Sequence, residues 1–83
     1  MDAIVGEIVR QKLDAGILPH EAPAVVWSGY GTGESCVVCE QPILQAQTEY
    51  EAQYDQRPAI RFHFSCHGVW REELRRRDTD SIG

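Results

Sequence analysis

The spacing of the cysteines constrains this chain more than any other feature. Cys36 and Cys39 are separated by two residues, 23 residues follow, and then His63 and Cys66 are again separated by two. All 3 cysteines of the chain belong to this pattern. Three thiolates and one imidazole fill the tetrahedral shell of a structural zinc ion and leave no open coordination position. The pattern therefore predicts one zinc ion that stabilises the fold and takes no part in chemistry.

The length of the chain makes such a metal important. With 83 residues, we expect one small α+β domain that covers residues 1–83. A domain of about 60 to 80 residues buries only about 60% of its unfolded surface and is marginally stable without a staple. A structural zinc ion contributes roughly 10–16 kcal/mol of apparent binding free energy, against about 5–15 kcal/mol for the stability of a whole domain. Zinc is therefore expected to decide whether this chain folds.

The cysteine number and the first segment indicate the compartment. Small secreted domains usually carry a larger, even number of cysteines, whereas this chain has 3. Charged residues interrupt residues 1–18, which excludes a secretory signal there: Asp2, Glu7, Arg10, Lys12 and Asp14. No apolar run approaches the roughly 18 residues of a membrane span. We therefore expect a cytoplasmic protein in a reducing environment.

The charge is unevenly distributed along the chain. The net charge is −5, and residues 1–55 carry two basic and nine acidic side chains. Residues 56–83 carry six basic and four acidic side chains. An acidic body with one basic end argues against a general nucleic-acid coat.

The first part of the chain reads as a helix followed by a connector. Apolar residues recur at helical spacing over residues 2–15, which predicts an N-terminal helix within residues 1–18. This helix either covers the rest of the domain or pairs two chains. Residues 19–35 form a connector with a short strand at residues 25–27. Its glycines do not match a dinucleotide fingerprint, and they are expected to let the backbone bend or pass close to the metal.

The second part of the chain reads as a zinc-binding module over residues 36–77. A tight turn at residues 36–43 precedes a strand at 48–55, in which apolar and polar residues alternate. A turn at residues 55–58 leads into a returning strand at 60–64. Ser65 is expected to cap a helix over residues 66–77, and residues 78–83 are expected to form a flexible tail.

This order of knuckle, hairpin and helix, with ligands at Cys36, Cys39, His63 and Cys66, resembles the treble-clef zinc finger family. The spacing is also similar to the first zinc module of LIM domains. The resemblance covers residues 34–77 and implies a structural zinc ion held by these four residues. The chain differs from LIM domains because it lacks the ligands of a second module and has a longer final helix. The partners of LIM domains therefore do not carry over.

One ligand remains ambiguous from the sequence. His67 follows Cys66 directly and could replace His63 as the fourth ligand, although the His63-x2-Cys66 spacing is the commoner arrangement. If His67 does not bind the metal, it is expected on the helix surface or beside the site.

Other cysteine chemistries fit the pattern less well. A redox role for Cys36 and Cys39 needs a thioredoxin-like strand and helix, but Pro42 and a hairpin follow. Covalent haem attachment needs histidine directly after the second cysteine, where this chain has Glu40. Iron–sulfur clusters are rarely held by three cysteines and a histidine. Catalysis by a cysteine–histidine pair is disfavoured because the metal uses every thiol.

These observations favour a non-enzymatic zinc-stabilised module that binds another protein. Its support is a closed metal shell together with aromatic residues expected at the surface: Trp27, Tyr30, Tyr50 and Tyr54. The alternative is a nucleic-acid-binding regulator whose last helix contacts phosphates through Arg71, Arg75 and Arg76. An enzyme is not expected, since the sequence offers no catalytic constellation. The partner and the oligomeric state stay open at this level.

Overall fold

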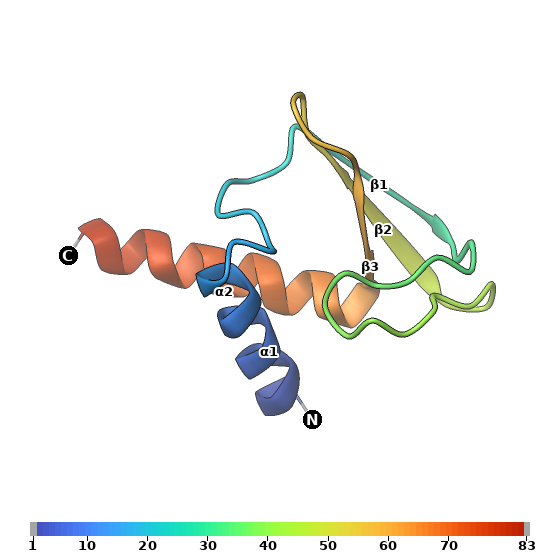
Figure 1. Cartoon of the computed structure of the whole chain (residues 1–83), viewed down its shortest axis with the longest axis horizontal. Coiled ribbons are helices and arrows are strands. Elements are labelled where there is room, and N and C mark those ends of the chain that lie inside the picture. The colour runs from blue at the N-terminus through green and yellow to red at the C-terminus, as the bar shows by residue number, and fades with distance from the viewer. Residues whose placement is uncertain (1, 83) are drawn as a thin grey trace.

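The computed structural model describes residues 2–82, and it describes the side chains of residues 3–78. Its elements follow in the order α1 (Asp2–Asp14), β1 (Val25–Tyr30), β2 (Thr48–Gln53), β3 (Ile60–His63) and α2 (Phe64–Ile82). The strands form one antiparallel sheet in the order β1-β2-β3. Helix α2 lies against β2 and β3, and α1 lies against α2 (Figure 1). This arrangement confirms the predicted small α+β domain.

Helix α1 uses its apolar stripe within the chain. Val9 and Leu13 are completely buried, and the helix contacts α2. Gly16, with a positive φ of 77°, ends the helix as a C-cap residue. The N–H of Ile17 then donates to the carbonyl of Lys12 at 2.9 Å and turns the chain away. Helix α1 thus covers part of the domain, which is one of the two roles predicted for it.

The sheet has one face toward α2 and one face away from it. Ala52 and Phe62 are completely buried on the α2 side, as the alternation of apolar and polar residues predicts. Glu51 and Arg61 are opposite each other in the register on the other face, and Nη2 of Arg61 lies 3.8 Å from Oε2 of Glu51.

Strand β1 is longer than the predicted residues 25–27. It continues to Tyr30 and pairs with β2 along its whole length. The prediction ended at residue 27 because Ser28 and Gly29 interrupt the apolar pattern. The strand continues because the backbone of these residues still pairs with β2.

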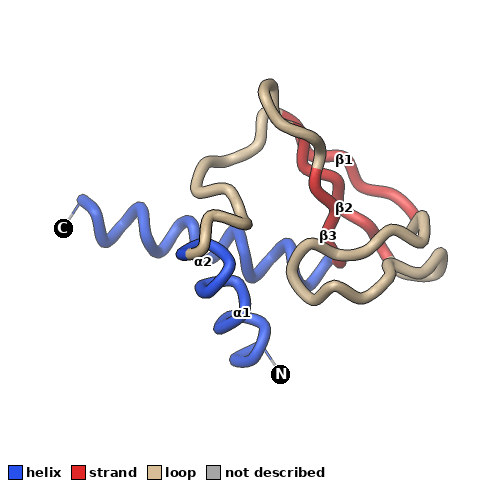
Figure 2. The backbone as a smooth tube through the Cα atoms, in the orientation of Figure 1, coloured by secondary structure: helices blue, strands red, loops and turns tan. Residues whose placement is uncertain are grey.

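The hydrophobic core lies between the sheet, the helices and the long loops. Trp70 of α2 is at its centre, stacked on Phe62 with ring centroids 4.8 Å apart. The indole N–H of Trp70 donates to the carbonyl of Pro19 at 3.2 Å and thereby ties the connector to α2. Leu18 and Ile43 close the core from the loops drawn in tan in Figure 2.

Helix α2 differs from its prediction at both ends. It begins at Phe64, directly after β3, so Ser65 lies inside the first turn and is not the residue that caps the helix. It continues to Ile82, so the expected flexible tail at residues 78–83 is helical as far as it is described, and residue 83 lies outside the described chain. Ion pairs between Glu72 and Arg75 and between Glu73 and Arg77 support these later turns.

Despite its length of 19 residues, α2 is too polar to span a bilayer, and no other helix in the described part of the chain meets that requirement.

Candidate metal centre

The first two ligand candidates lie in a tight turn. The N–H of Glu40 donates to the carbonyl of Cys36 at 2.9 Å, and the N–H of Cys36 donates to the carbonyl of Gln41 at 2.9 Å. A bridge between Ser35 and Pro42 closes the turn. Glu40 has a positive φ of 65°, which reverses the chain directly after Cys39. The backbone thus directs Cys36 and Cys39 toward the same point.

A close backbone contact holds this turn against the strand before it. A Cβ atom on Gly31 would overlap the carbonyl oxygens of Ile43 and Leu44, so only glycine fits there. Gly33 has a positive φ of 86° and donates its N–H to the carbonyl of Ile43 at 2.9 Å. These contacts agree with the expected role of the glycines beside the knuckle.

The structure brings the four predicted ligands together. His63 is the last residue of β3 and Cys66 lies in the first turn of α2, where the positive end of the helix dipole favours a thiolate. The ligand atoms of Cys36, Cys39, His63 and Cys66 all lie within 4.8 Å of one another. A tetrahedral zinc ion with Zn–S bonds of about 2.3 Å places its sulfur ligands roughly 3.8 Å apart. The cluster therefore has the size and the ligand types of a zinc site.

The ring of His63 is oriented for coordination. Its Nε2–H donates to the carbonyl of Pro42 at 3.2 Å, because a carbonyl oxygen can only accept. In the neutral imidazole this bond leaves the lone pair on Nδ1, which lies 3.3 Å from the Sγ of Cys39. A backbone carbonyl that fixes the tautomer in this way is a common feature of histidine ligands.

The sulfur atoms lie in surroundings that stabilise negative charge. The pKa of Cys36 is lowered to about 4, chiefly because its sulfur accepts a hydrogen bond from the Cys66 thiol and further bonds from backbone N–H groups. Two of these donors are Val38 at 3.4 Å and His63 at 3.5 Å. The same bond to Cys36, together with burial, raises the pKa of Cys66. A divalent cation that binds both sulfurs would displace the proton they share, which would pass to solvent.

Lys12 is a functional candidate that the sequence pattern did not indicate. It comes from α1, and its Nζ donates to the carbonyl of Val37 at 2.7 Å, within the knuckle. The same Nζ lies 2.8 Å from a carboxylate oxygen of Glu40, and it lowers the pKa of that carboxyl by hydrogen bonding and by its charge. Three thiolates with one Zn²⁺ would carry a net charge of −1, which this ammonium group would offset. The only sign of this role is that Lys12, although charged, lies on a half-buried side of α1.

His67 lies apart from the ligand cluster. Its ring packs against Tyr50, Phe62 and Trp70, with centroid distances of 4.6, 5.4 and 5.8 Å. Burial lowers its pKa, and its Nε2 has no hydrogen-bond partner among the described residues. His67 therefore belongs to the aromatic core beneath the site, and the structure groups His63 with the three cysteines.

The arginines predicted for nucleic-acid contact are exposed on α2, but each already interacts with an acidic or aromatic side chain of the same helix. Arg75 forms an ion pair with Glu72 at 2.5 Å, and Arg76 lies 3.8 Å from Glu73. The guanidinium of Arg71 lies over the ring of Trp70, 5.9 Å from its centroid. Acidic and basic groups alternate on this surface, which weakens its attraction for phosphates.

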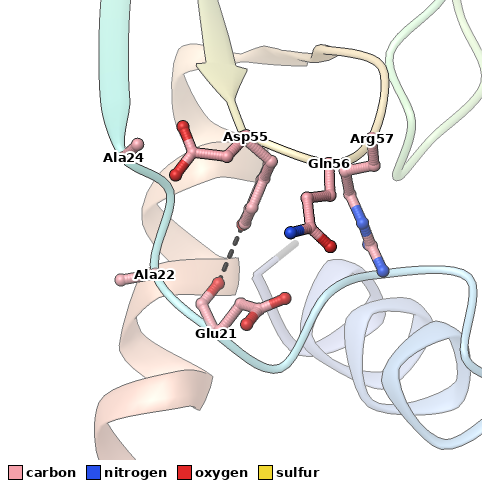
Figure 3. A pocket seen from close by; sticks show the side chains of 7 residues that line it. Glu21, Ala22, Ala24, Asp55, Gln56 and Arg57 are labelled. Atoms are coloured by element: carbon pink, nitrogen blue, oxygen red, sulfur yellow. Dashed lines mark hydrogen bonds between the residues drawn. The ribbon is translucent and has the colours of Figure 1, made fainter.

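A hollow lies between the connector and the β2–β3 turn, away from the ligand cluster (Figure 3). Glu21 lines it from the connector, and Asp55, Gln56 and Arg57 line it from the turn. Tyr54 donates its O–H to the carbonyl of Glu21 at 2.8 Å, and burial raises the pKa of this phenol to about 12. This contact fixes the connector to the hairpin and so serves the fold.

The geometry of the cluster shows that these four residues could hold a metal ion. The likeness to treble-clef fingers stays a prediction. No protein-family model, curated protein or solved structure matches this chain.

Proposed function

We propose that this chain is a small non-enzymatic module, that one structural zinc ion at Cys36, Cys39, His63 and Cys66 holds its fold, and that the fold binds another protein. The observation that carries the proposal is the cluster of four ligand atoms within 4.8 Å, with the ring of His63 already fixed by Pro42. Zinc fits better than calcium or magnesium, because those ions prefer oxygen ligands.

The proposed zinc ion is structural because the site is closed. Cys36 and Cys66 are only 1% and 4% exposed. Four protein ligands complete a tetrahedral shell, and a catalytic zinc ion needs one position for water or substrate. The ligands also come from three separate parts of the chain: the knuckle, β3 and α2. One ion would therefore connect elements that a domain of this size holds together only weakly.

Protein binding is supported by aromatic residues on β1. Trp27 and Tyr30 are 58% and 83% exposed, and aromatic side chains are enriched at protein interfaces. Tyr50 and Tyr54 were expected at the surface as well, but they are half-buried against the core. The interaction surface is therefore narrower than the sequence indicated and centres on β1.

A matched pair of variants tests the metal centre. We expect the chain expressed with zinc to hold one ion in native mass spectrometry and to lose its circular dichroism signal when a chelator removes the ion. His63→Gln should lose the zinc ion, whereas His67→Gln should keep it, because His67 lies in the core and not in the cluster. A chain that binds no zinc, or a fold that ignores chelation, would refute the proposal.

Nucleic-acid binding by Arg71, Arg75 and Arg76 stays a prediction, and the ion pairs on α2 argue against it. A mobility-shift assay at low ionic strength tests it directly. Binding that weakens with salt, and in an Arg71→Gln/Arg75→Gln variant, would favour this alternative.

A further inference from the structure

Strand β1 has one edge without a neighbouring strand. It is one of the two outer strands of the sheet (Figure 1), and its six residues, VVWSGY, include no charged residue and no proline. Natural proteins usually protect such an edge with lysine, proline, a bulge or a covering helix. Within the described chain, α2 contacts β2 and β3 but not β1. The edge is thus open to another strand.

The register identifies the backbone groups that face this edge. Gly31 donates its N–H to the carbonyl of Gln47, its partner in the register of β1 and β2. Antiparallel strands alternate between residues bonded to a neighbour and residues bonded away from it. The N–H and C=O groups of Val26, Ser28 and Tyr30 therefore point to the free edge, while those of Trp27 and Gly29 point to β2.

We propose that β1 pairs antiparallel with β1 of a second copy of this chain, with Ser28 opposite Ser28 of the partner, to form a six-stranded sheet. In this register Val26 faces Tyr30 of the partner. The free N–H and C=O groups of Val26, Ser28 and Tyr30 therefore all lie opposite free N–H and C=O groups of the partner strand. A shift by two residues would place Tyr30 opposite Ala24, whose N–H already donates to Gln53 of its own chain. A shift by one residue would put the side chains on opposite faces.

The side chains complement one another in the same register. Val26 and Tyr30 are exposed on the α2 side of the sheet, where they would cover each other across the pair. On the other side, Trp27 would lie over Gly29 of the partner. The space above Gly29 is open, since a Cβ placed there meets no atom within 4 Å. The exposed side chains of Val26, Trp27 and Tyr30 therefore each find a neighbour in this register.

The local absence of charge permits a second copy along this edge. Each chain carries a net charge of −5, so two copies repel, and a contact without charged residues adds the least to that repulsion. β1 is an uncharged segment, so pairing there brings no like charges directly opposite each other. This inference rests on the proposed function and names the partner that it requires.

Sedimentation equilibrium of the zinc-loaded full chain tests the dimer. We expect a weak, concentration-dependent dimer, because one strand pair buries less than a standard interface of about 1,600 Å². Ser28→Lys and Ser28→Glu each place like charges opposite each other and should weaken the dimer at least about tenfold. A mixture of the two variants should restore association. Gln11→Lys, at an exposed position of α1, is the matched control and should leave the dimer unchanged.

Hydrogen exchange of the unmodified chain gives a second measurement that does not depend on a variant. The amides of Val26, Ser28 and Tyr30 should become more protected as the concentration rises, because they would donate to the partner strand. A chain that stays monomeric, or a dimer that Ser28→Lys leaves intact, overturns the inference. So does a monomer that instead binds an extended segment of another protein along β1.

The same samples separate this inference from the proposed function. A zinc-loaded monomer refutes only the dimer, whereas a chain without zinc refutes the metal centre.

Discussion

The contact between Lys12 and the zinc knuckle yields the sharpest prediction about stability. Lys12→Met keeps the length of the side chain but removes the ammonium group that donates to the carbonyl of Val37 at 2.7 Å. The Lys12 side chain is only 14% exposed, so the carbonyl would lose its partner in a largely buried place. A hydrogen bond with a charged partner contributes about 1.5–3 kcal/mol. We therefore expect the zinc-loaded chain to lose about 2 kcal/mol of unfolding free energy.

This loss should be measurable as zinc affinity. If the metal-free chain is unfolded, zinc binding includes folding, and about 2 kcal/mol corresponds to roughly a 30-fold weaker affinity. Competition with a zinc-binding dye measures that ratio directly. Glu40→Gln is the matched control: it removes the exposed carboxylate at the other end of the same ion pair but keeps the bond to Val37. Exposed ion pairs contribute little, so this variant should bind zinc almost as tightly as the unmodified chain.

Two results would refute the reasoning. Wild-type affinity in Lys12→Met would mean that the Val37 contact does not stabilise the knuckle. An equal loss in Glu40→Gln would mean that the ion pair, and not the carbonyl contact, is responsible.

Three further predictions concern the glycine contact, the core and pH. Gly31→Ala should cost at least about 2 kcal/mol, because its Cβ would overlap two carbonyl oxygens, whereas Gly29→Ala, with open space around it, should unfold at the same temperature as the unmodified chain or higher. Trp70→Phe should lose about 2 kcal/mol and lower Tm by roughly 8–16 °C, since it removes the bond to Pro19 and leaves a cavity; an unchanged Tm would contradict the central role of Trp70. Acidification should release zinc, because an unfolded thiol has a pKa of about 8.5, and the stability gained from bound thiolates is complete above that pH and is lost progressively as the pH falls toward the lower pKa of the bound thiolates. A dye-release titration that is flat between about pH 8 and pH 5 would argue against thiolate ligands.

The four ligand candidates could be predicted from the sequence because they fall into two pairs of closely spaced residues. Each pair of ligands is only three positions apart, so the turn that joins Cys36 to Cys39 and the strand end that joins His63 to Cys66 bring them together. The alternation in β2 and β3 likewise depends on neighbouring residues, and Phe62 lies on the buried face of the strand predicted from it.

The features that the sequence did not reveal depend on contacts between distant residues or on the backbone. Lys12 meets the knuckle 25 positions further along the chain, which no periodic pattern indicates. Phe64 continues the alternation of β3, so the pattern assigned it to the strand although α2 begins there. The full length of β1 was not predicted because serine and glycine, at positions 28 and 29, do not favour a strand by themselves.

The contact between α1 and α2 has a consequence for the order in which this chain can fold. The first and last helices of the chain are neighbours, and Arg77 of α2 pairs with Asp14 of α1 at 3.1 Å, 63 positions away. During synthesis α1 leaves the ribosome first, but the surface that covers Val9 and Leu13 is completed only when α2 has been made. The fourth ligand, Cys66, also emerges late. The domain can therefore complete its core only after α2 has been made, and until then the apolar side of α1 lacks the helix that covers it.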